Sequence, residues 1–173
     1  MDYWTAFIDY IHERDSAIKT GKPHDWHYLP FPIGRANVAL SPLVYAKDKR
    51  IAMQLYFHGP NAISYFEQIK AEKEEIEKEI GENLVWDHTQ STSRDVIIFK
   101  DNEDIKNTTS WPEQHKWFYE NLEAFYKVFA ERVKNLSSDY LPEDNVNFPN
   151  DGQYLEAQPS DLRVPKDILT GNT

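Results

Sequence analysis

IAMQLYFHGP, residues 51–60, is the stretch that decides the fold. Every second residue from Ile51 to Phe57 is a large apolar residue, and side chains two apart point to the same face of a strand. The stretch therefore predicts a half-buried strand, and Gly59-Pro60 predicts that a helix follows at once, because proline is tolerated in the first helical turn. The other face of the strand carries Ala52, Gln54, Tyr56 and His58.

The segments before this strand predict a helix and a second strand. An apolar stripe with helical spacing predicts a helix over residues 3–15. Residues 37–46 predict a strand that is bulged or lies at a sheet edge at Pro42, because proline cannot donate to a ladder. Residues 47–50, Lys-Asp-Lys-Arg, predict the polar turn between the two strands.

The segments after the strand predict two further helices and two further strands. The apolar stripe over 60–80 predicts one helix ended by Gly81. Residues 84–88 and 94–100 predict strands joined by a turn at 90–93. Ser110 and Glu113 fit a capping box, which predicts that the last helix starts at Ser110. The stripe of this helix includes Phe125 and Phe129, which are expected in the core.

The predicted order is helix, two or three strands, helix, two strands and helix. It favours an α+β fold, an antiparallel sheet of four to five strands with three helices, in a single domain of residues 1–136. Residues 137–173 hold seven acidic and two basic side chains, a net charge of −5, and four prolines. Apolar residues are spaced along them like anchors, so this segment is expected to be an irregular, acidic tail packed on the domain in extended form.

Composition limits the classes of function. The 173 residues include no cysteine, which excludes disulfides and thiolate chemistry and favours a cytoplasmic protein. No apolar run is long enough to span a bilayer, and the first residues lack the features of a signal peptide. A formal net charge of −10 argues against a large surface for duplex nucleic acid. The sequence predicts no membrane partner.

The sequence also lacks a recognisable catalytic motif. His24-Asp25-Trp26-His27 offers groups that bind metals, but no second acid–histidine pair of known spacing accompanies it, so no metal site is predicted. A metal-dependent nuclease of the acid-x-Lys type needs an acid two residues before Lys100, where the chain has Ile98. No glycine-rich phosphate loop is present. We therefore predict no catalytic residue and no cofactor.

A ligand-binding surface is nevertheless predicted around the central hairpin. Aromatic side chains on a sheet, together with Arg and Gln, stack on and hydrogen-bond bases or peptide groups. The alternative is that a helix covers this face and the aromatic residues are core, and that Arg35 pairs with an acid and fixes the hairpin to a helix. The predicted ligand-binding residues are Arg35, Tyr56, His58, Trp26 and Gln54, with Tyr45 on the same polar face.

Three segments together resemble a known family. They are the opening Tyr3-Trp4-x-x-Phe7, the stretch of residues 31–35 (FPIGR), and residues 111–117 (WPEQHKW). They resemble domain-of-unknown-function family 4268, over about residues 2–136. Family members are standalone proteins or C-terminal parts of larger ones, some with a nuclease-like N-terminal domain. The resemblance implies a role in restriction or defence by association only, and it supplies no catalytic residues.

Three functional hypotheses follow. The first is a non-catalytic recognition domain, an accessory to nucleic-acid processing or defence, with a protein partner or a nucleic-acid-associated complex; a concave aromatic and arginine face would favour it. The second is a metal-dependent nuclease or other hydrolase, which a cluster of two histidines and two acids would favour. The third is a structural protein, a homodimer through its long helices, which a large exposed apolar helix face would favour.

Overall fold

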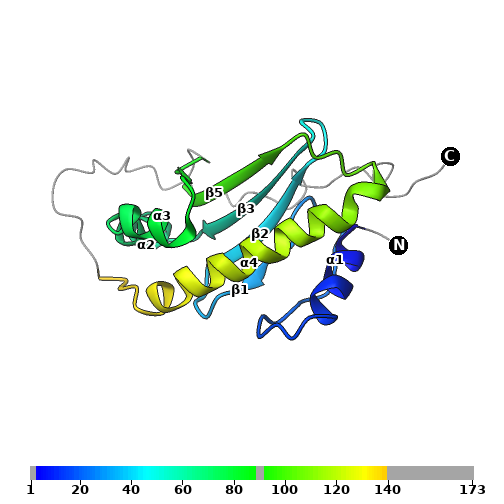
Figure 1. Ribbon diagram of the computed structural model, residues 1–173. Coiled ribbons are helices and arrows are strands. Elements are labelled where there is room, and N and C mark those ends of the chain that lie inside the picture. The colour runs from blue at the N-terminus through cyan, green and yellow to red at the C-terminus, as the bar shows by residue number, and fades with distance from the viewer. Residues whose placement is uncertain (1–2, 89–91, 140–173) are drawn as a thin grey trace.

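The computed structural model describes residues 3–88 and 92–139, and it confirms the α+β class (Figure 1). The predicted tail, from residue 140 onward, and part of the predicted 90–93 turn lie outside the described residues. The described residues form four α-helices, one more than expected, and five strands. In chain order they are α1 (Tyr3–His12), β1 (Phe31–Pro32), β2 (Val38–Tyr45), β3 (Arg50–Phe57), α2 (Ala62–Lys70), α3 (Lys73–Ile80), β4 (Val85–Trp86), β5 (Arg94–Asp101) and α4 (Trp111–Lys134), with a 3-10 turn over Thr108–Ser110.

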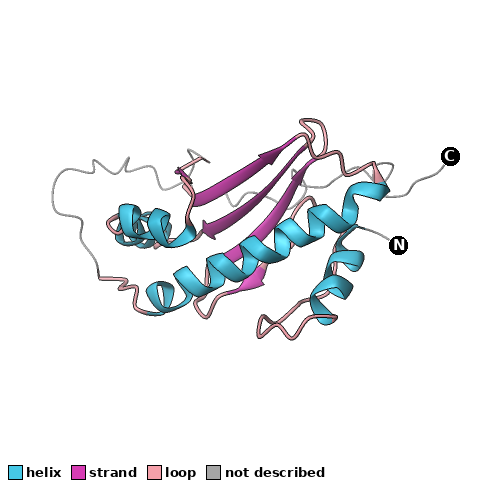
Figure 2. Cartoon of the chain, viewed as in Figure 1, coloured by secondary structure: helices cyan, strands magenta, loops and turns pink. Residues whose placement is uncertain are grey.

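The five strands form one antiparallel sheet in the order β1-β2-β3-β5-β4. The predicted strand over 51–58 is therefore the centre of the sheet, with Leu55 opposite Leu40 on one side and opposite Val96 on the other. The long helix α4 crosses in front of the sheet in Figure 1, and α2 and α3 lie at one end of it. Figure 2 shows the same two layers, with the helices in cyan and the strands in magenta.

The main core lies between the sheet and the helices. Alternate residues of β3 from Ile51 to Phe57 are fully buried there, as predicted, but the prediction of a half-buried strand is wrong at Ala52 and Gln54, which are buried on the other face. From α4, Phe125 and Phe129 reach the same core with zero exposed fraction and an inter-ring distance of 5.3 Å, as their stripe predicted. Within the described residues, no helix is long and apolar enough to cross a membrane.

The predicted bulge at Pro42 is wrong. Residues Val38 to Tyr45 pair one-to-one with Phe57 to Arg50, without an extra residue. The carbonyl of Pro42 accepts a hydrogen bond of 3.1 Å from the Leu29 backbone N–H, so it points away from β3. In an antiparallel strand the N and O of one residue point to the same side, so the missing N–H of Pro42 costs the β2–β3 ladder no hydrogen bond.

The single helix predicted over 60–80 is two helices. The backbone leaves the helical conformation at Glu72, where φ is −101° and ψ is 18°. No Gly or Pro marks this break, and the contact that accompanies it is tertiary: Arg132 of α4 forms ion pairs with Glu72 at 2.8 Å and with Glu79 at 2.7 Å. Gly81 ends α3 in the left-handed conformation with φ of 83°, as predicted.

Other predicted elements are longer than the observed ones. The first helix ends at His12 rather than residue 15, and the strand predicted over 84–88 is reduced to Val85–Trp86. The capping box at Ser110 is also wrong, because the Ser110 side chain makes no cap hydrogen bond to α4. Instead Asn107 accepts a hydrogen bond from the Thr109 backbone N–H and donates to the Ser110 hydroxyl at 2.9 Å. The chain thus enters α4 through a 3-10 turn that Asn107 caps.

Replacing Asn107 by Ala is therefore expected to reduce the free energy of unfolding by about 1 kcal/mol, within the range for the loss of a cap. Ser110→Ala removes one exposed acceptor and is expected to change it by less than about 0.5 kcal/mol. Urea denaturation of the two variants against the parent protein measures both. A larger loss of unfolding free energy for Ser110→Ala than for Asn107→Ala would support the predicted capping box at Ser110.

Candidate functional site

Arg35 lies on the helical side of the sheet, at the C-terminal end of α4. Its Nε donates to the Val133 carbonyl at 3.0 Å, and its Nη2 donates to the carbonyls of Lys134 at 3.1 Å and Leu136 at 2.6 Å. Its Nη1 donates to the Tyr65 hydroxyl at 3.1 Å. Arg35 therefore fixes the hairpin to a helix, but through the carbonyls that end α4 rather than through an acid.

The structure does not bring Arg35 together with the other predicted ligand-binding residues. Tyr56 and Gln54 alternate along β3 with the core residues, so they point to the face opposite the helices. The rings of Tyr56 and His58 stack at 5.8 Å with an interplanar angle of 23°. Gln54 is buried with an exposed fraction of 8%, between Ser41 of β2 and Ile97 of β5.

Trp26 reaches the same face from the segment that precedes β1. Tyr28 forms a bridge to Leu43 of β2, and the ring of Trp26 lies 5.3 Å from that of Tyr28. Burial raises the pKa of Tyr28, and the charge of Tyr56 raises it further. The Trp26 ring also stacks on the His24 ring at 4.6 Å. Trp26 therefore contacts Tyr28, while the stacked pair of Tyr56 and His58 lies farther along the same face.

A second row of aromatic side chains continues this face toward the β2–β3 turn. The rings of Tyr45 and Phe99 are 6.0 Å apart, and the Arg50 guanidinium lies 4.7 Å from the centre of the Phe99 ring. Burial, with help from the charge of Asp95, raises the pKa of Tyr45 to about 12. Sequence reasoning missed Tyr28 and Phe99. The signal for Phe99 was the run from Val96 to Phe99, which is apolar on both faces, as is typical of a strand covered on both sides.

Beneath these aromatic side chains lies a small apolar floor. It is a buried cluster of Leu43, Ala52 and Ile97, separate from the main core, against which Tyr28, Tyr45 and Phe99 pack. No residue of a described helix belongs to this cluster. Val85, opposite Ile97 on β4, extends the apolar surface to the sheet edge with an exposed fraction of 44%. We call this surface the open face, defined by Tyr28, Leu43, Tyr45, Ala52, Gln54, Tyr56, Ile97 and Phe99.

The described strands place few charges on the open face. Their one basic side chain there, Arg50, pairs with Asp101, and Asp95, opposite Tyr56, is buried beside His88. Arg94 and Lys100, opposite Phe57 and Ile51, point to the helical side of the sheet, where each has an acidic neighbour. The face is therefore aromatic and sparsely charged, which suits contacts of short range.

A buried histidine lies apart from the open face, between α1 and α4. Burial lowers the pKa of the His115 imidazole to about 4, and a hydrogen bond to the Tyr3 backbone opposes this only partly. Tyr3, Phe7 and Trp111 surround the ring, and the Tyr3 hydroxyl donates to the neighbouring Gln114 at 2.9 Å. A neutral, enclosed imidazole of this kind is packed as core.

The described residues supply only part of one of the three features that separate the functional hypotheses. Within residues 3–88 and 92–139, no three His, Asp or Glu side chains lie close enough to share a metal ion, and His24 and His27 gather no further ligand. The exposed large apolar residue of these segments, Val85, is on a strand rather than a helix. The aromatic face is present, without Arg35.

Comparison with known proteins gives one match. The model of the family described as domain of unknown function (DUF4268) matches residues 1–133. No curated protein and no solved structure matches the chain. The family match covers the sheet and almost all of α4. The matched residues include all three segments of resemblance noted in the sequence. The chain therefore belongs to the DUF4268 family of domains of unknown function.

Proposed function

We propose that this domain is a non-catalytic recognition module that binds an extended polypeptide segment on the open face. The observation that carries the proposal is the group of partly exposed aromatic side chains Tyr28, Tyr45 and Phe99, packed over a buried apolar cluster to which no residue of a described helix belongs. Aromatic rings provide large contact areas at low conformational cost, and they dominate the binding energy of protein interfaces.

Charge favours a polypeptide over a nucleic acid as the ligand of this face. Nucleic-acid surfaces owe most of their affinity to lysines and arginines that neutralise phosphates. Here the one basic side chain that the described strands place on this face, Arg50, already pairs with Asp101, and the chain has a net charge of −10. The family resemblance suggests a role as an accessory to nucleic-acid-processing or defence machinery. In that role the domain would bind a protein of the machinery rather than its nucleic acid.

Photo-crosslinking from the open face tests the proposal. The photoreactive residue p-benzoylphenylalanine replaces Tyr56 in the full chain, and replaces Tyr126 of α4 in a matched control, because both tyrosines are partly buried. Irradiation in a lysate of the source cells, with and without nuclease, is followed by mass spectrometry. The expected result is the same protein captured at position 56 in both samples, and none at position 126.

Tyr56→Ala separates recognition from folding. Because Tyr56 is partly buried and its ring contacts lie on the open face, the substitution is expected to lower the free energy of unfolding by only about 1 kcal/mol. Competition by the purified Tyr56→Ala protein for the partner captured by the crosslinker is expected to be at least about tenfold weaker than by the parent. Equal competition, or crosslinks to nucleic acid alone, would contradict the proposal.

A further inference from the structure

We propose that, when no protein partner is bound, the open face binds the chain's own C-terminal segment, residues 140–173. This inference rests on the proposed function, since it concerns the ligand of the same surface. Three observations support it: the place where the described chain ends, the length of the segment, and its side chains.

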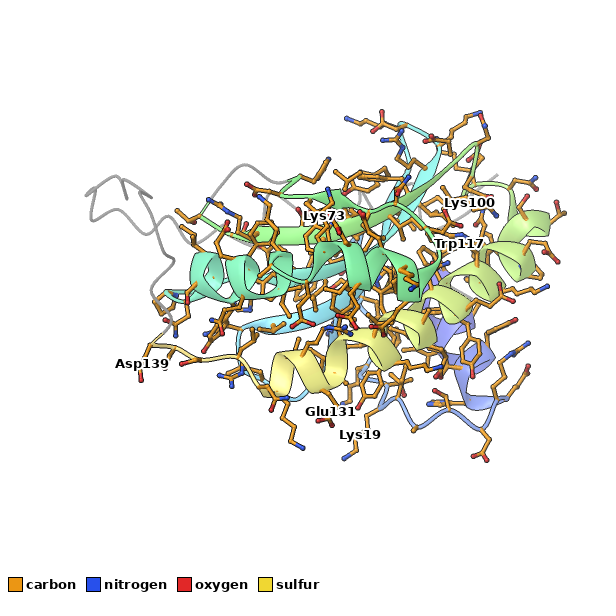
Figure 3. All side chains as sticks on the ribbon, turned by 60° about the vertical axis from the view of Figure 1, so that its left-hand side comes forward. Lys19, Lys73, Lys100, Trp117, Glu131 and Asp139 are labelled. Carbon is orange, nitrogen blue, oxygen red and sulfur yellow. The ribbon has the colours of Figure 1, made fainter. Side chains whose placement is uncertain are left out.

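The chain leaves the described domain at the end of the sheet where Tyr56 and His58 lie. Gln68 of α2 accepts a hydrogen bond from the Ser137 backbone N–H at 2.9 Å and donates to the Ser137 carbonyl at 2.8 Å. Because α2 follows β3 directly, this anchor is close to the C-terminal end of β3. Figure 3 shows Asp139 at the far end of the molecule from Trp117 and Lys100.

The segment is long enough to cross the sheet. Residues 140–173 number 34, and an extended chain covers about 3.3 Å per residue, so their reach is up to roughly 110 Å. The three long strands have eight residues each, which corresponds to about 26 Å. The segment can therefore pass around the sheet edge and run along the whole open face.

The side chains of the segment match a face of partly exposed aromatic rings. Prolines 142, 149, 159 and 165 disfavour a helix and regular pairing as an added strand, and they favour an extended backbone that binds through its side chains. Small clusters of apolar residues lie between these prolines. The candidates for contact with the rings of Tyr28, Tyr45 and Phe99 are Val146, Phe148, Tyr154, Leu155 and Leu162.

Cysteine crosslinking in the full chain tests the inference, and the absence of native cysteine makes every introduced pair unambiguous. Ala39, opposite Tyr56 on the open face, is replaced by Cys; Lys127, exposed on α4, is the control. Each is combined in turn with Val146→Cys, Leu155→Cys or Leu162→Cys. Dilute purified protein is treated with a short bismaleimide, and peptide mapping follows the intramolecular product.

We expect at least one segment cysteine to react with position 39 at least about tenfold faster than with position 127, since the rate follows the effective concentration of the two thiols. Equal rates, or faster reaction with position 127, overturn the inference. If this preference is absent but a partner is still captured at position 56, the inference about the segment is contradicted and the proposed function is supported. If position 39 is preferred but no partner is captured, the segment is supported as a cover of the sheet, and the proposed binding of a separate protein is contradicted.

Discussion

Phe125→Ala is expected to reduce the free energy of unfolding by about 3–5 kcal/mol, the usual cost of emptying the site of a buried aromatic ring. Phe125 has zero exposed fraction and packs edge-on against Phe129 in the core between α4 and the sheet. Because α4 has 24 residues and contacts both β2 and β3, the space left by the ring cannot be closed by a local shift of the helix.

Urea denaturation followed by circular dichroism measures this loss. Lys116→Ala is the matched control on the same helix, because Lys116 is exposed and Ala is a good helix former. Its expected effect is within about 0.5 kcal/mol of the parent protein. A loss below about 1 kcal/mol for Phe125→Ala would mean that the ring does not fill the core, and that the stripe of α4 faces something else.

Arg35→Ala is expected to reduce the free energy of unfolding by about 3 kcal/mol, because hydrogen bonds from a charged donor contribute about 1.5–3 kcal/mol each and are not additive. The substitution removes the Arg35 donor from the carbonyls of Val133, Lys134 and Leu136, of which Val133 keeps a backbone hydrogen bond from Leu136. It also removes the positive charge that faces the negative end of the α4 dipole. The last turn of α4 is the part of the molecule expected to fray.

Arg35→Lys distinguishes geometry from charge. Lysine keeps the positive charge but has a single nitrogen, which cannot reach three carbonyls and the Tyr65 hydroxyl together. We expect it to recover less than half of the lost stability. Lys134→Ala, at an exposed position of the same turn, is the control and is expected to have little effect.

The same Arg35→Ala protein also tests the ligand-binding role that the sequence predicts for this residue. Unchanged unfolding together with loss of the partner captured at position 56 would support that role, and would contradict the assignment of Arg35 to the end of α4. A large loss of stability, with crosslinking from position 56 retained under conditions where the variant is folded, is the result that the geometry favours.

The sequence predicted those features that depend on periodicity within one element. Alternation over residues 51–57 identified both faces of the central strand, and the aromatic stripe of α4 identified Phe125 and Phe129 as core. Gly81 marked the end of α3, because glycine adopts the left-handed conformation without the steric cost of a Cβ. The α+β class followed from the order of these elements. Each of these signals is local, since the side chains concerned repeat at the spacing of their own backbone.

The candidate site was predicted only in part, for a related reason. Alternation along β3 placed Gln54 and Tyr56 on one face, and Trp26 was expected beside them. Tyr28 and Phe99 could not be placed, because the neighbours of their segments across the sheet depend on strand order. In this sheet β5 lies beside β3, and β4 takes the outer position. Apolar residues on both faces of β5 carried the remaining signal.

Only the tertiary structure determined the contacts between groups that are far apart in the chain. Arg35 looked like a ligand-binding residue because its neighbours are Gly34 and a polar hairpin, yet its partner Leu136 lies 101 residues away. The break between α2 and α3 coincides with ion pairs to Arg132, and Pro42 is tolerated because its nitrogen faces away from β3. Periodicity in the sequence identifies which side of each element is apolar. Which polar group meets which depends on how the elements pack, because a hydrogen bond requires both partners within about 3 Å.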